Sequence, residues 1–301
     1  MRRIDSTTNT QQCPAERDSN YRAIVTEFLH TPHAKMFIDD FCDHYSTTLS
    51  KHISGRNFFK VNDNENIFKL FWGYDFLEYD LDKLLSNITR NLILFGKAYV
   101  ERIYFYDDKG ILVGISYKCI NCKKIKHRAN FIKYNLKTDD NHKIKGQISN
   151  KSVIVFNIRD LGFSKKFFVR KIKKLKKIDF PETKLALAEY FDIDFFKNKS
   201  EYSLLKIMKN IFWNGRKTNN IYVSEPYFLY RNMMFKKLRL SFLEYLISQI
   251  NKDINSIESE TEFSGKIIFD SIAYDYDNLI MELESGEKNC KQVSNVIFKV
   301  L

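Results

Sequence analysis

Glycine and proline are scarce in this sequence: its 301 residues include ten glycines and four prolines. Both residue types interrupt helices and strands, so their scarcity argues against a sandwich of short strands joined by many turns. The chain instead contains 26 phenylalanines and 17 tyrosines. This composition favours long, unbroken elements around a core rich in aromatic side chains.

Long apolar runs and a regular set of cysteines are also missing. No segment has eighteen consecutive apolar residues, so we expect no transmembrane helix. The N-terminus begins with basic residues but lacks the apolar stretch of a secretory signal, and we expect residues 1–20 to be a flexible polar segment. Five cysteines, an odd number at scattered positions, suit a reducing cytoplasm better than a disulfide framework.

No set of residues completes a catalytic or metal site. Cys119 and Cys122 form one CxxC pair with His127 nearby, but a structural zinc site usually requires two such pairs. Cysteines at the end of a predicted strand are more often small core residues. Gly162 and Ser164 lack the second glycine of a nucleophile elbow. We therefore expect no cofactor and no metal, and a binding or structural role is favoured over an enzyme.

A metal-dependent nuclease stays open as an alternative. Asp160, Glu182 and Lys184 mimic an acidic residue followed by E-x-K, a pattern that holds Mg²⁺ and orients a water molecule. In such enzymes the E-x-K lies on a strand. Here Pro181 precedes a segment typical of a helix start, where an acidic residue is ordinary because it complements the helix dipole.

The hydrophobic pattern predicts an α+β fold in which long helices pack around a small antiparallel sheet. We expect an α+β domain over residues 21–160 that contains a hairpin over 97–118. A mainly helical domain is predicted over 161–301. Its longest periodic run, at about 225–257, lacks internal glycine and predicts one long helix.

Small residues mark the ends of these elements. From Leu81 to Phe95 apolar residues recur at steps of three and four, and the glycine that follows is typical of a helix end. The β-branched segment 152–158 predicts a buried strand followed by a turn and a helix. Four residues are predicted to set the turns, the last of them as a helix cap: Gly96, Gly110, Gly162 and Ser164.

The net charge of +12 is concentrated in one tract. Residues 123–177 contain eighteen Lys or Arg and three Asp, a local net charge of +15, so the rest of the chain is slightly acidic. Concentrated cations indicate a polyanionic partner, because binding to phosphates relieves their mutual repulsion and releases counterions. A solvated surface and an anionic membrane surface stay open as alternatives.

Within this tract, residues 164–178 have the pattern of an amphipathic helix. At about 100° per residue, Phe168, Ile172 and Leu175 fall on one apolar stripe. Few aromatic residues interleave with the cations on the other face, so we expect contacts with phosphates, most of all of duplex DNA, and no stacking on single-stranded bases. The predicted nucleic-acid-binding residues on that face are Lys166, Arg170, Lys173, Lys174 and Lys177.

Two segments carry short motifs that resemble tailed-bacteriophage portal proteins. Residues 85–118 resemble the family's helix, "x-x-G-x-A-Y" strand and polar glycine turn, and residues 152–176 resemble its strand, "G-x-S" turn and helix. The matching positions are Gly96, Ala98, Tyr99, Gly110, Gly162 and Ser164.

The resemblance implies a portal-like fold and a structural function as a head–tail connector. Such a protein assembles with copies of itself into a ring at one capsid vertex, and DNA passes through the ring. A separate terminase supplies the motor, and capsid proteins are further partners. The implied location is the cytoplasm of a bacterial host or the virion, in a phage or a prophage remnant. The main alternative is a nucleic-acid-binding protein of a mobile element or defence locus.

Overall fold

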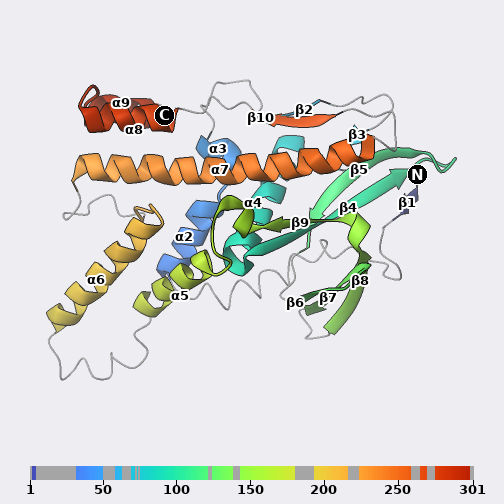
Figure 1. Ribbon diagram of the computed structural model, residues 1–301, viewed down its shortest axis with the longest axis horizontal. Helices are drawn as coiled ribbons and strands as arrows, with labels where there is room; N and C mark the ends of the chain where they lie inside the picture. Colours follow the sequence, from blue (N-terminus) through green and yellow to red (C-terminus); the bar gives the residue numbers. More distant parts are fainter. Residues whose placement is uncertain are drawn as a thin grey trace.

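The computed structural model confirms the predicted α+β class, with helices packed against small, mainly antiparallel sheets (Figure 1). Of the segment expected to be a flexible N-terminus, only residues 2–4 belong to the part of the chain that the structure describes. The described residues are 2–4, 32–49, 58–62, 69–71, 73, 75–120, 124–137, 143–179, 193–215, 224–258, 265–269 and 275–298.

One helix is much longer than the others and lies where the sequence predicts a long helix. It is α7, which runs across most of the molecule (Figure 1). Among the described helices, none is both long and apolar enough to cross a bilayer. The α-helices are α2 (Pro32–Cys42), α3 (Tyr45–Leu49), α4 (Leu77–Phe95), α5 (Phe167–Asp179), α6 (Ile193–Asn210), α7 (Glu225–Glu258), α8 (Tyr276–Ser285) and α9 (Cys290–Phe298).

The largest sheet is built on the hairpin that the sequence predicts over 97–118. Its strands β4 (Lys97–Tyr106) and β5 (Leu112–Cys119) pair in antiparallel register. In the turn between them Gly110 has a φ of 82°, in the left-handed region that favours glycine. The Asp107 carboxylate accepts hydrogen bonds from the N–H groups of Lys109 and Ile111, at 2.9 and 2.7 Å.

Three short strands complete this sheet. Strands β1 (Arg2–Ile4) and β9 (Val153–Asn157) pair with different halves of β4, both antiparallel. Strand β3 (Lys69–Leu70) pairs in parallel with β5, so the sheet is antiparallel except at this edge. The 3₁₀ helices η2 (Asn150–Ser152) and η3 (Ile158–Leu161) flank β9.

Two further sheets are small. Strands β2 (Phe59–Asn62) and β10 (Lys266–Phe269) form an antiparallel pair. Strands β6 (Lys124–His127), β7 (Phe131–Lys137) and β8 (Lys143–Ser149) form a three-stranded antiparallel sheet inside the basic tract. The buried side chains of Tyr134 and Ile148 in this sheet form a separate small hydrophobic cluster with Ile120, which follows β5.

The main hydrophobic cluster extends from α2 to β10. It includes Phe41 of α2, Ile88 of α4 and Phe168 of α5, together with Phe242 of α7. The predicted boundary between residues 160 and 161 therefore runs through a shared core. Aromatic contacts dominate its centre: the Phe41 ring lies 5.3 Å from that of Phe168 and 5.1 Å from that of Phe242.

Candidate nucleic-acid interface

Two glycines shape the chain just before α5. Gly162 ends η3 with a φ of 79°, and its N–H donates to the carbonyl oxygen of Arg159 at 2.9 Å. Gly96 ends α4 with a φ of 75°, and a Cβ at that position would lie 2.5 Å from the carbonyl oxygen of Lys165. Gly96 therefore permits both a left-handed turn and the close approach of the segment that leads into α5.

Ser164 lies in a turn ahead of the helix, where the sequence predicts a helix cap. Helix α5 begins at Phe167, whose N–H donates to the carbonyl oxygen of Ser164 at 2.9 Å. The late start places Phe167 and Phe168 beside Phe163, with ring centroids 5.2 Å from Phe163 in both cases. Packing of these neighbouring rings accompanies the shift of the helix start from the predicted position.

The apolar stripe of α5 is buried as its periodicity predicts. Phe168, Ile172 and Leu175 are 1%, 2% and 0% exposed. The Phe168 ring also lies 5.9 Å from that of Phe242 on α7. Burial of a phenylalanine and two branched aliphatic side chains stabilises the docked helix by several kcal/mol, on the order of 2 per side chain. Helix α5 is thus fixed to the core along one face.

The opposite face of α5 presents positive charge to solvent. The five predicted nucleic-acid-binding residues are all exposed: Lys166, Arg170, Lys173, Lys174 and Lys177. Lys166 lies just outside the helix, one residue before its start. The ion pairs found between described residues involve none of the five, so within that part of the chain no carboxylate neutralises them.

The neighbouring Lys171 responds to this concentration of charge. Its amino group lies over the Phe167 ring, 5.6 Å from the centroid. Partial burial lowers the pKa of Lys171, and the positive charge of Lys174 lowers it further. An anion bound on this face would reverse the second effect, because it would offset the repulsion between the lysines.

The basic tract as a whole is divided between two structural units. One unit is α5, and the other is the β6–β8 sheet, which lies apart from α5 (Figure 1). On the sheet, Lys126, Arg128 and Lys133 are exposed. The sequence concentrates positive charge in residues 123–177, and the fold divides that charge between the sheet and the exposed face of α5.

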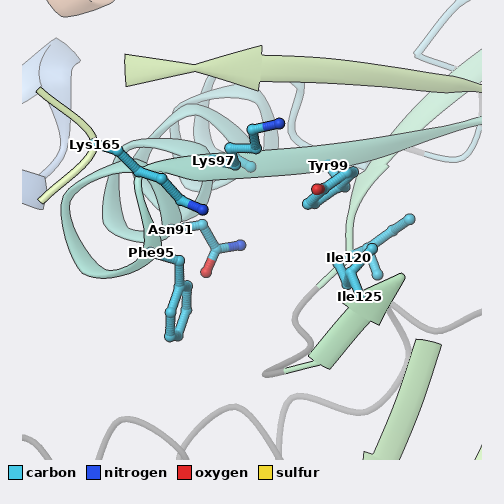
Figure 2. A pocket seen from close by; sticks show the side chains of 8 residues that line it. Asn91, Phe95, Lys97, Tyr99, Ile120, Ile125 and Lys165 are labelled. Carbon is cyan, nitrogen blue, oxygen red and sulfur yellow. The ribbon is translucent and has the colours of Figure 1, made fainter. Parts of the chain in front are cut away.

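A small pocket lies beside the segment that leads into α5. It is lined by residues of α4, β4 and β6, and Lys165 extends over it toward Asn91 (Figure 2). Its volume is about 180 Å³. Sites for small organic ligands usually occupy roughly 300 to 1,000 Å³, so this pocket is too small for a nucleoside.

The predicted metal and catalytic alternatives gain no support within the described chain. Cys119 is buried, and the side-chain amide of Asn91 donates to its sulfur at 3.1 Å. The side chains of Cys122 and His127 lie outside the described residues. Among the described residues, no three Asp, Glu, His or Cys side chains gather in a way that would hold a metal.

The nuclease pattern is only partly described. Asp160 is exposed in η3, and its carboxylate accepts a hydrogen bond from the Tyr245 hydroxyl at 2.8 Å. Glu182 and Lys184 lie outside the described residues. The contact with Tyr245 gives Asp160 a structural role in joining η3 to α7.

Comparison with known proteins assigns no family. No protein-family model matches the chain, and no curated protein matches it either.

Proposed function

We propose that the protein binds duplex nucleic acid through the exposed face of α5. The observation that carries this proposal is the division of α5 into a buried apolar stripe and a solvent-facing row of cations. Because the apolar stripe fixes α5 to the core, its lysines are held on the surface without ion pairs to other described residues. Phosphates satisfy such a row, whereas distinguishing all four bases also requires hydrogen-bond acceptors, which lysine and arginine side chains lack.

The dimensions of α5 suit a short stretch of phosphate backbone. Its 13 residues span about 20 Å at 1.5 Å per residue. Along one strand of B-DNA, phosphates occur once per roughly 3.4 Å of helix axis, so about six lie within that length. If the five cations each neutralise one phosphate, log K should fall against log salt with a slope of about −4 to −5.

Fluorescence anisotropy with a labelled duplex, measured across a series of salt concentrations, tests the proposal. The test variant reverses three charges on α5: Lys173→Glu, Lys174→Glu and Lys177→Glu. The matched control reverses three exposed charges on the β6–β8 sheet: Lys126→Glu, Arg128→Glu and Lys133→Glu. Both variants change the net charge by the same amount.

The α5 variant should lose at least a hundredfold in affinity, and the magnitude of its salt slope should fall by about 3. The control variant should keep affinity within about tenfold of the parent protein. Its charges lie away from α5 and act on DNA bound there only through the long-range electrostatic potential. Equal losses in the two variants, or unchanged binding in the α5 variant, would show that α5 is not the interface.

A second candidate function is that of a portal-like, ring-forming structural protein. Its support is local. The helix, glycine and hairpin unit at residues 85–118 is present, as is the strand, glycine turn and helix unit at 152–176. Native mass spectrometry tests it: a ring is a large multiple of 35.8 kDa, and a dominant monomer at micromolar concentration would exclude ring assembly under those conditions.

A further inference from the structure

A second, larger cavity lies between the end of α2, the turn that follows α6 and the first half of α7. Its volume is about 350 Å³. Aromatic side chains including Trp213 and Phe235 form part of its wall, while Asp40, Lys236 and Arg239 supply charged groups. The cavity thus combines flat apolar surfaces with two cations and one carboxylate.

Two arginines are buried beside this cavity, and among the described residues only the more distant charges of Asp43 and Asp82 act on one of them, Arg239. Arg231 and Arg239 are only 2% and 3% exposed. Within the described chain neither forms an ion pair: Arg231 donates to the carbonyl oxygen of Trp213, and Arg239 donates to that of Asp43. The Nε of each arginine is buried and has no hydrogen-bond partner among the described residues. Buried charge of this kind is unfavourable unless an anion compensates it.

Hydrogen bonds also fix two other polar groups of the cavity wall, Asp40 and Asn214. The Asp40 carboxylate accepts a hydrogen bond from the Trp213 indole N–H at 2.8 Å through one of its two oxygens. Asn214 donates from Nδ2 to the carbonyl oxygen of Phe228 at 2.9 Å, which leaves its buried Oδ1 without a partner among the described residues. Burial lowers the pKa of Lys236 to about 8, and Arg239 contributes to that shift.

The turn that borders the cavity contains one residue in a strained backbone conformation. Phe212 has a φ of 54°, in the left-handed region that side chains other than glycine rarely occupy. Gly215 has a φ of 71° in the same turn. Both residues contribute to the cavity wall. Strain in a non-glycine residue at a cavity is a recurrent feature of ligand sites, because the fold holds the backbone in a shape that serves binding.

We propose that this cavity binds a small organic anion, a phosphate or carboxylate group attached to a flat ring. The anionic group lies by Lys236 and Arg239, and the ring lies against Trp213 and Phe235. The volume is near the lower limit for small-molecule sites, which restricts the ligand to about the size of a nucleoside monophosphate. This site involves none of the α5 cations and does not depend on nucleic-acid binding.

Isothermal titration calorimetry and saturation-transfer NMR on the full chain at pH 7 test the proposal. Adenosine monophosphate and indole-3-acetate supply the two anion classes on a flat ring. Adenosine alone and inorganic phosphate alone are the controls for the ring and the anion. At least one ring anion should bind with a submillimolar Kd, and both controls should bind at least tenfold more weakly. Absence of binding by both ring anions at millimolar concentration would overturn the proposal.

Two neighbouring lysines on α7 provide a matched pair of variants. Lys236→Met removes the cation in the cavity and should weaken binding at least tenfold. Lys237→Met removes the next cation, which pairs with Asp277 of α8, and should leave the Kd within about twofold. Equal effects of the two variants would refute the assignment of the site.

Two additional variants protect the test against ambiguous results. Asn232 also lines the cavity and is only partly buried, so Asn232→Leu should weaken binding without removing a charge, even if Lys236→Met folds poorly. The triple charge reversal on α5 should leave binding of the ring anion unchanged. Loss of ring-anion binding in the α5 variant would contradict the independence of the cavity from the α5 face. Unchanged binding in Asn232→Leu would contradict the assignment of the ligand to the cavity.

Discussion

The Arg102 guanidinium on β4 and the Asp253 carboxylate on α7 form an ion pair, with Nη2 2.7 Å from Oδ1. The hydroxyl of Tyr117 on β5 donates to the other carboxylate oxygen at 3.0 Å. Burial raises the pKa of Asp253, and the positive charge of Arg102 opposes that rise. This largely buried polar contact joins the main sheet to the longest helix.

Replacement of Asp253 by Asn should destabilise the protein by about 3 kcal/mol, because it leaves the Arg102 charge largely buried without its carboxylate. Asp277→Asn is the control, since it removes an exposed carboxylate that pairs with Lys237 and should cost less than about 1 kcal/mol. Urea denaturation followed by circular dichroism measures both changes. Similar costs for the two variants would mean that the Arg102–Asp253 pair is effectively solvated.

Replacement of Gly96 by Ala should be more destabilising than replacement of Gly110 by Ala. Both glycines have left-handed φ values, 75° and 82°, so each substitution incurs about 1 to 2 kcal/mol of backbone strain. At Gly96 the new methyl group would also meet the Lys165 carbonyl oxygen at 2.5 Å, whereas at Gly110 no atom lies within 4 Å. We expect an extra cost of at least about 1 kcal/mol at Gly96. Equal changes in the free energy of unfolding would contradict the close approach.

Lys236 should make stability depend on pH between about 8 and 10. Its folded-state pKa of about 8 lies below the ordinary value of 10.5, so in this window the unfolded chain binds a proton that the folded chain has released. Stability then rises with pH, by about 1 to 3 kcal/mol relative to Lys236→Met. Subtracting the Lys236→Met profile removes the contribution of tyrosines such as Tyr45, whose pKa burial raises.

Arg239 on the same helix and Asp40 on α2 are the other charged side chains that line this cavity among the described residues. Both are present in the parent protein and in Lys236→Met, so the difference between the two profiles isolates Lys236. Lys237→Met should retain the pH dependence of the parent protein, because it does not alter the cavity. A flat difference between the parent protein and Lys236→Met from pH 7 to 10 would be incompatible with a lowered pKa at Lys236.

Phe168→Ala should destabilise the protein by about 3 to 5 kcal/mol, because it opens a cavity where α5 meets α2 and α7. The ring lies within 6.4 Å, centroid to centroid, of those of Phe37, Phe41 and Phe242. Phe76→Ala is the matched control, since that ring is 75% exposed and should change the free energy of unfolding by less than about 0.5 kcal/mol. Thermal and urea denaturation should rank the two variants in this order.

Features that depend on near neighbours in the chain could be predicted from the sequence. The three- and four-residue steps before Phe95 and the glycine that follows match α4 and its left-handed end at Gly96. The stripe and charged face of α5 have the burial that their spacing predicts. These features follow from helix periodicity and turn preferences, which act over a few residues.

Features that depend on distant contacts were missed. The β6–β8 sheet carries a signal that sequence reasoning could have used, because Ile132 and Tyr134 alternate with polar residues at the period of a strand. The cavity carries no such signal. Its lining residues Asp40, Asn214 and Lys236 are separated by more than twenty positions at every step, and each on its own is an ordinary polar residue.

The sequence by itself determined the α+β class, the concentration of positive charge and the amphipathic character of α5, because composition and periodicity are properties of short segments. Only the tertiary structure decided that the basic tract divides between a sheet and a helix. It also decided that Arg231 and Arg239 are buried beside an aromatic cavity. The physical reason is that burial and charge compensation depend on which distant segments pack together, and the main core draws its side chains from α2 through β10.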